Sequence, residues 1–137
     1  MYNEVQVFAE NKSGKLAKVA GVLGNAGINI INFQIADVGQ FGAFKILTAD
    51  PDKTAQVLRD AGMVVALNPV TVVEIADKPG ALVALGNALT DAGVNVLDAY
   101  GCLLEKGQRA IFVVHGDKAD LAEKAAKSAG FTTLSEL

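Results

Sequence analysis

Residues 10–30 read ENKSGKLAKVAGVLGNAGINI, and residues 76–96 read ADKPGALVALGNALTDAGVNV. At a constant offset of 66 positions, the two stretches carry the same lysine, glycine, leucine, alanine and asparagine landmarks in the same order. The matched pairs are Lys12 and Lys78, Gly14 and Gly80, Leu16 and Leu82, Leu23 and Leu89, Ala26 and Ala92, Gly27 and Gly93, and Asn29 and Asn95. The chain therefore contains two copies of one unit of about 66 residues.

The similarity continues toward the end of each copy, with loop insertions of one residue. Residues 48–50 correspond to 115–117, and residues 61–62 correspond to 129–130. The copies meet near residues 67–69. We therefore predict two domains, residues 1–67 and residues 68–137.

Local patterns predict the same elements in both copies. Val5 and Val7 alternate with polar neighbours, which favours a half-buried strand, and apolar residues at helical spacing predict a helix over residues 13–26. The elements expected after it are strands over residues 28–36 and 43–48, a helix over 50–62 and a strand over 63–67. In the second copy we expect strands over 73–75, 94–104, 109–115 and 131–134, and helices over 78–92 and 117–130.

Both copies thus have the order βαββαβ. This order indicates an α+β fold made of two tandem ferredoxin-like units, each an antiparallel sheet with its helices on one face. Asn11 or Ser13 is expected to cap the first helix, and Pro79 suits the first turn of its counterpart. Gly27 and Gly93 stand where a left-handed residue ends a helix.

Composition excludes several classes of protein. The chain of 137 residues has no apolar run near the roughly 20 residues that cross a bilayer, so no membrane partner is expected. Its net charge of -3 argues against nucleic acid. The N-terminus lacks the features of a signal peptide, and the lone Cys102 cannot form an internal disulfide, so we expect a cytoplasmic protein.

No chemistry of catalysis, metal binding or cofactor binding is visible in the sequence. One histidine and one cysteine are too few soft ligands for a zinc site, and no glycine-rich nucleotide motif occurs. His115 has no motif that would complete a catalytic pair, and Cys102 fits a small buried hydrophobe. We therefore expect no enzyme, no metal and no cofactor.

The loop after each first strand is the most informative segment. Free N–H groups at a helix start suit a carboxylate, and Gly14 and Gly80 leave room for a close approach. Asn11 offers both donors and an acceptor. The same residues also fit a tight strand-to-helix turn that needs glycine and a side-chain cap, and spacing alone leaves both interpretations open.

Asparagine also recurs at the start of the second strand of each copy. Asn29 and Asn95 lie between apolar residues, although asparagine is a poor strand residue. They could contact a ligand from a sheet edge, or finish the turn by bonding local backbone. These residues alone favour neither reading.

The pattern Asn-x-x-Gly-x-Leu, a helix, and then Ala-Gly-Ile-Asn-Ile resembles the ACT domain, a regulatory module of amino-acid metabolic enzymes. The resemblance covers both copies and is closest to small stand-alone proteins made of two ACT domains, whose first hairpin often carries a Phe-Gly like residues 41–42. It implies the ferredoxin-like fold. It also implies that an amino-acid effector lies between the strand-to-helix loop of one domain and the second strand of its neighbour.

The resemblance places ligand contacts at particular positions. Asn11, Gly14 and Asn29 match the family pattern in the first copy, whereas Asp77 replaces the loop asparagine in the second. A carboxylate there would repel a ligand carboxylate and attract an ammonium, so the first loop is the preferred carboxylate binder. The candidate ligand-binding residues are Asn11, Lys12, Ser13, Gly14, Lys15, Leu16, Asn29, Ile30, Asp77, Gly80, Asn95 and Val96.

Two functions of different classes follow. The first is a non-enzymatic sensor that binds a free amino acid between ACT domains, forms a homodimer and acts on a metabolic enzyme or regulator. The alternative is a regulatory subunit that docks on an enzyme and has vestigial ligand sites. A screen against free amino acids separates the two.

Overall fold

The computed structural model describes residues 1–10, 12–39, 41–105 and 109–137. These residues form two compact units. The N-terminal unit is Asn3–Asn68, and the C-terminal unit is Pro69–Leu137 together with Met1–Tyr2. Asn11, which the sequence nominated as a ligand residue, lies outside the described residues.

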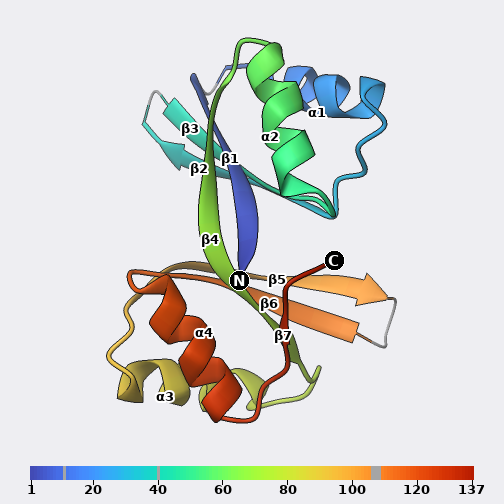
Figure 1. Ribbon diagram of the computed structural model, residues 1–137. Coiled ribbons are helices and arrows are strands. Elements are labelled where there is room, and N and C mark those ends of the chain that lie inside the picture. The colour runs from blue at the N-terminus through green and yellow to red at the C-terminus, as the bar shows by residue number, and fades with distance from the viewer. Residues whose placement is uncertain (11, 40, 106–108) are drawn as a thin grey trace. The chain divides into compact units, whose positions relative to one another are not determined.

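The N-terminal unit is built on the sheet order β2–β3–β1–β4, with both β2–β3 and β1–β3 antiparallel (Figure 1). Its elements are β1 (Tyr2–Glu10), α1 (Lys15–Asn25), β2 (Asn32–Val38), β3 (Phe41–Leu47), α2 (Pro51–Asp60) and the first part of β4 (Val64–Ile75).

The C-terminal unit repeats this order as β7–β4–β6–β5. Its elements are the rest of β4, α3 (Ala81–Asp91), β5 (Val96–Glu105), β6 (Arg109–Gly116), α4 (Ala119–Ser128) and β7 (Thr133–Leu134). All three of its strand pairings are antiparallel. The prediction of an α+β fold with two ferredoxin-like units is confirmed.

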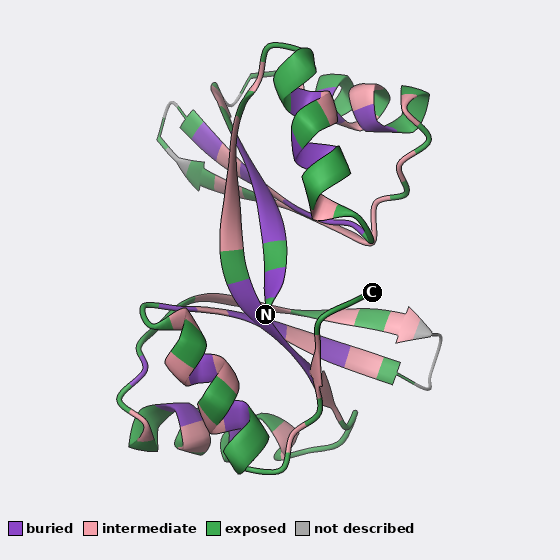
Figure 2. Ribbon diagram, in the orientation of Figure 1, coloured by how far each residue is buried: buried purple, intermediate pink, exposed green. Residues whose placement is uncertain are grey.

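In each unit the two helices cover one face of the sheet and bury their apolar sides against it (Figure 2). Val19 and Leu23 lie one turn apart on α1 and are buried, as are Leu85 and Leu89 on α3. The N-terminal core joins them to Val5, Val7, Phe44, Ile46, Ala55 and Leu58, and the C-terminal core to Val73, Val94, Val114, Ala122 and Ala126.

The structure corrects two predicted boundaries between strands and turns. The expected separate strands over 63–67 and 73–75 are one strand, Val64–Ile75, that runs through Pro69. Seven of the other eleven positions are β-branched, which favours a strand, and proline itself favours extended backbone before it. The strands after α1 and α3 begin at Asn32 and Val96, later than expected.

The helix caps differ from the prediction as well. Gly14 and Gly80 are the N-cap residues of α1 and α3, with φ of 90° and 84°, and no side chain among the described residues caps either helix. Ser13 therefore does not cap α1, and Pro79 precedes the cap of α3. The predicted cap at Asn11 lies outside the described residues. A left-handed residue turns the chain from strand to helix here, which only glycine does without strain. Gly27 and Gly93 take the expected left-handed conformation after their helices.

The second helices begin differently in the two units. Asp50 caps α2, because its Oδ1 accepts a hydrogen bond from the Lys53 N–H over 3.1 Å. Asp117 does not cap α4, whose N-cap residue is Lys118. The Asp117 carboxylate instead accepts a hydrogen bond from the Asn95 N–H.

Candidate functional site

The first candidate loop joins the end of β1 to the start of α1. Lys12, Ser13 and Gly14 are exposed, and the Lys15 N–H donates to the Lys12 carbonyl over 3.2 Å. Since no side chain of the described residues caps α1, its first turn presents N–H groups and the positive end of the helix dipole on the exposed side of the loop. The side chain of Leu16, next in the helix, is 51% exposed. This arrangement suits a small anion.

Basic side chains surround this helix start. Lys12 Nζ lies 2.6 Å from Glu10 Oε2, and both side chains are exposed. The hydrogen bond between them lowers the pKa of Glu10 and raises the pKa of Lys12. Lys15 and Lys18 line a hollow of about 180 Å³ together with Glu10 and Phe8. The lysines attract anions to this end of α1.

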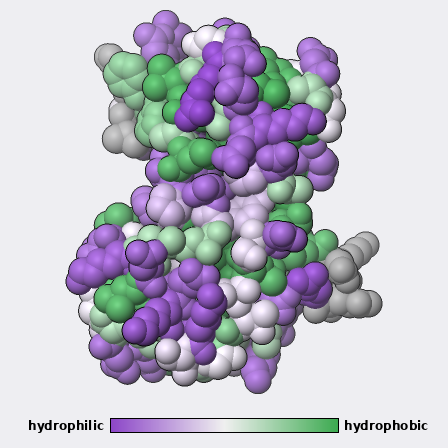
Figure 3. Space-filling model, in the orientation of Figure 1, coloured by the Kyte–Doolittle hydropathy of each residue, from purple (hydrophilic) through white to green (hydrophobic). Residues whose placement is uncertain are grey.

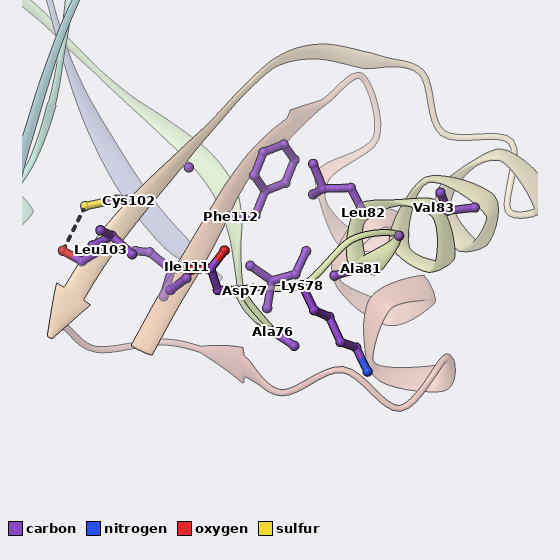
Figure 4. Close-up of a pocket in the computed structure, with 14 residues that line it drawn as sticks. Ala76, Asp77, Lys78, Ala81, Leu82, Val83, Cys102, Leu103, Ile111 and Phe112 are labelled. Carbon is purple, nitrogen blue, oxygen red and sulfur yellow. Dashed lines mark hydrogen bonds between the residues drawn. The ribbon is translucent and has the colours of Figure 1, made fainter. Parts of the chain in front are cut away.

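The second loop has the same backbone form. Gly80 takes the place of Gly14 at the start of α3, and Asp77, Lys78 and Gly80 are exposed. The loop also borders a cavity of about 560 Å³. The cavity is lined by Ile75, Ala76, Asp77, Lys78, Gly80, Ala81, Leu82, Val83, Gly101, Cys102, Leu103, Ala110, Ile111 and Phe112 (Figure 4).

The candidate asparagines lie at the other end of the helices. Asn29 is exposed and precedes β2, and the neighbouring Ile30 packs against the N-terminal core. Asn95 is also exposed, and its N–H donates to Asp117 Oδ1 over 2.9 Å. Its neighbour Val96 begins β5 and is 42% exposed. The side-chain amides of Asn29 and Asn95 are exposed, so they are the groups of these residues that could contact a ligand.

Within one unit, the loop and the asparagine do not come together. They are separated by the length of α1 or α3, and a helix of 11 residues is about 16 Å long. A small molecule that touches both groups needs the loop of one domain and the asparagine of another.

The structure adds site residues that the sequence did not nominate. Gly101, Leu103 and Phe112 line the large cavity, although none of them was a candidate. The available signal was Gly101 itself, because a glycine inside a strand marks a place where something approaches the backbone. Hydrophobic residues are visible on the surface of the molecule (Figure 3). Among those that line the cavity, Leu82, Val83 and Leu103 are each more than half exposed.

His115 and Cys102 lie on the neighbouring strands β6 and β5. His115 is half-buried on β6 and is paired in register with Asp98 of β5. The Cys102 thiol lies 3.7 Å from the carbonyl of the adjacent Leu103. Within the described ranges, no cluster of three or more His, Cys, Asp or Glu side chains could hold a metal ion.

A match to a known family model decides which family this chain belongs to. The model of the ACT domain pair matches residues 1–130. The chain belongs to the ACT domain pair family. The resemblance stated from the repeat is therefore confirmed, and the two units are ACT domains in tandem. No curated relative matches the chain.

Solved structures show the same fold. Protein BT0572 from Bacteroides thetaiotaomicron is similar at 28% identity and a TM-score of 0.88, over 97% of this chain and 91% of that one. The ligand-free regulatory subunit of aspartate kinase from Thermus thermophilus is similar at 16% identity and a TM-score of 0.63, over 94% and 93% of the two chains. The corresponding subunit from Thermus flavus has 19% identity and a TM-score of 0.56, over 94% of each chain.

The two aspartate kinase regulatory subunits share the fold of this ACT pair. In the described part of the chain, no helix is long and apolar enough to cross a bilayer.

Proposed function

We propose that this ACT domain pair is a non-enzymatic, cytoplasmic regulatory protein that binds a free amino acid at the start of α1. The observation that carries the proposal is the uncapped helix N-terminus behind Gly14, whose φ is 90°. Its N–H groups suit the ligand carboxylate, and Lys15 and Lys18 add positive charge nearby, whereas Lys12 is paired with Glu10.

The ammonium group of the ligand requires an oxygen acceptor. The side-chain carbonyl of Asn29 or Asn95 is the acceptor that we propose, with Ile30 or Val96 beside it. Because each unit holds its loop and its asparagine at opposite ends of a helix, the two groups come from different ACT domains. A homodimer is part of the proposal.

The two loops differ in charge. Asp77 stands in the second copy where the first has Asn11, and a carboxylate at this place disfavours the ligand carboxylate. We therefore assign the carboxylate to the first loop. Binding there would be passed to a metabolic enzyme or a regulator through a change in assembly.

The test uses two glycines at opposite ends of α1. Gly14 and Gly27 both have positive φ, and a Cβ added to either would meet nothing within 4 Å. Gly14→Asp places a carboxylate where the ligand carboxylate would bind, whereas Gly27→Asp adds the same charge at the far end of the helix. Thermal shift and calorimetry against the common amino acids provide the readout.

We expect at least one amino acid to bind the unaltered protein and Gly27→Asp, and not to bind Gly14→Asp. Tight binding retained by Gly14→Asp would overturn the assignment of the site. If no amino acid binds the unaltered protein, the interpretation as a regulatory subunit that docks on an enzyme replaces the sensor.

A further inference from the structure

The sheet of the N-terminal unit has one face that its helices do not cover, because α1 and α2 lie together on the other side (Figure 1). Val7 of β1 and Phe44 of β3 belong to the core beneath the helices, and side chains alternate between the two faces along a strand. Phe8 and Phe41 therefore lie on the outer face. Both rings are open to solvent, since Phe8 is 46% exposed and Phe41 is 60% exposed.

The two rings belong to one apolar patch. Phe8 pairs in register with Ala43, which lies two residues from Phe41 on the same face of β3. A diagonal pair of this kind is within reach of aromatic side chains. On β4, the other neighbour of β1, Val65 packs against the core, and the adjacent Val64 is 67% exposed and lines the same hollow as Phe8. We call Phe8, Phe41 and Val64 the outer patch.

The C-terminal unit carries an ion pair where the N-terminal unit carries the two rings. Glu74 of β4 is equivalent to Phe8, because each follows a valine that pairs with a phenylalanine of the next strand. Arg109 of β6 is equivalent to Phe41, because each lies three residues before that phenylalanine. The side chains of Glu74 and Arg109 form a salt bridge.

The fold therefore does not require phenylalanine at either position. The C-terminal unit forms the same strands with charged side chains there, and polar residues are usual on the solvent-facing side of an antiparallel sheet. A contiguous apolar patch on a surface marks a place of interaction. The outer patch is thus typical of a surface that another molecule covers.

The charges around the outer patch indicate which kind of molecule fits it. Glu10 lies opposite Phe41 and is paired with Lys12. Lys45, which follows on the same face of β3, also has a partner. A nucleic acid needs free cations for its phosphates, and a membrane surface favours a strongly basic face. The neutral surroundings of the outer patch therefore favour the apolar surface of a protein.

A second copy of this chain supplies such a surface. The three side chains of the outer patch together expose roughly 300 Å², since a fully exposed phenylalanine presents about 200 Å². Two patches packed face to face would remove about 600 Å² of apolar area from water. A standard interface buries about 1,600 Å² in total, of which a little over half is apolar. The area suits a reversible dimer and not a permanent one.

The rim of the outer patch is also compatible with a second copy. Each copy brings one acid and one base there, Glu10 and Lys12, and both side chains are exposed. A two-fold axis can place the acid of one copy beside the base of the other, because the same surface serves both copies. Like charges then need not face each other across the contact.

We propose that the outer patch is an interface between two copies of this chain, packed sheet to sheet with Phe8 and Phe41 at its centre. The contact lies on the sheet face and uses neither the first loop nor the asparagines of the proposed amino-acid site. The two copies associate without a ligand, and the proposal does not rest on the proposed function.

Sedimentation equilibrium of the ligand-free protein over a wide range of concentrations tests the proposal. The variant carries Phe8→Glu and Phe41→Arg together, which installs the side chains of the C-terminal unit and keeps the strands formed. We expect the unaltered protein to reach at least twice the mass of one chain and the double variant to reach half the mass of the unaltered protein. The proposal fails if the two masses are equal, or if the ligand-free protein stays a single chain throughout.

A smaller change keeps the test valid if the double variant does not fold, which circular dichroism would show. Phe41→Ala should raise the dissociation constant of the dimer at least about tenfold, because each dimer loses the ring twice. An unchanged dissociation constant would exclude Phe41 from the interface and contradict the proposal.

Leu97→Glu is the matched control. Leu97 of β5 is 57% exposed, close to the value for Phe41, and lies outside the outer patch. Its substitution should leave the mass unchanged, and a loss as large as that of the double variant would mean that the outer patch is not the interface. If the protein assembles only after an amino acid is added, the outer patch is also excluded, while the proposed function stands.

Discussion

Asn95 and Asp117 exchange two hydrogen bonds. The Asn95 N–H donates to Asp117 Oδ1 over 2.9 Å, and the Asp117 N–H donates to the Asn95 carbonyl over 3.0 Å. Lys118 adds a third contact, since its Nζ donates to the Gly93 carbonyl over 3.0 Å. The segment between α3 and β5 is thereby tied to the segment between β6 and α4. Both of these bonds use the backbone of Asn95 and not its side-chain amide.

Asp117→Ala removes the side-chain acceptor and should lower the free energy of unfolding by about 1 kcal/mol, the usual value of one hydrogen bond. Asp117→Asn should lose less, because its amide oxygen can still accept from the Asn95 N–H. Urea unfolding followed by circular dichroism gives both values. Equal losses for the two variants would contradict this account.

The fold was predictable because the signals that define it are local. The buried pairs Val19 and Leu23 on α1, and Leu85 and Leu89 on α3, follow from helical spacing in each copy. The β4 strand was predicted as two pieces because the junction between the two copies was placed at residues 67–69. Its continuity depends on sheet pairing, which a local pattern does not contain.

The candidate site was less predictable than the fold. The glycines of both loops were found from the repeat, but the large cavity was missed. Its lining depends on the pairing of Gly101 with Phe112, where the first copy pairs Ile35 with Phe44. The sequence offset is 66 between Ile35 and Gly101 and 68 between Phe44 and Phe112, because loop insertions separate them. Only the strand register shows that these positions are equivalent.

Leucines at the two ends of α1 should respond differently to truncation. Leu23 is fully buried in the N-terminal core, and Leu23→Ala should cost about 2–5 kcal/mol of stability through the lost burial and the cavity. Leu16 is half exposed, and Leu16→Ala should cost less than about 1 kcal/mol. Urea midpoints of the two variants measure the difference. A cost at Leu16 equal to that at Leu23 would be inconsistent with the packing described.

Glu123 of α4 should make the stability of the C-terminal unit depend on pH. Lys127 Nζ lies 2.9 Å from its Oε1, and the N-terminal ammonium of Met1 lies 3.2 Å from the same atom. The hydrogen bond from Lys127, with that from the N-terminus, lowers the pKa of Glu123 below its ordinary value of 4.5. The folded state therefore gains stability from this group above pH 4.5 and loses it as the pH falls through the lowered pKa.

Glu123→Gln removes this titration, so the variant should lose less stability than the unaltered protein between pH 7 and pH 3. Urea unfolding at the two pH values measures both losses. Glu136→Gln is a suitable control, because Glu136 is exposed and, among the described residues, no hydrogen bond or ion pair engages its carboxylate. The assignment is wrong if Glu123→Gln and Glu136→Gln show the same pH dependence.

The backbone conformation at the start of α1, and not the packing around it, should account for the glycine at position 14. Gly14 and Gly21 are both exposed, and an added Cβ would meet nothing within 4 Å at either position. Gly14 has a φ of 90°, whereas Gly21 is inside the helix. Gly14→Ala should therefore destabilise the N-terminal unit by about 1–2 kcal/mol, because a left-handed backbone strains any residue with a Cβ. Gly21→Ala should stabilise it by about 0.5–1 kcal/mol, because alanine loses less conformational freedom in a helix. Urea unfolding of the two variants should give shifts of opposite sign. Shifts of the same sign would mean that the left-handed turn at Gly14 is not what requires glycine there, and that a bound ligand or a close approach of another chain must be the reason.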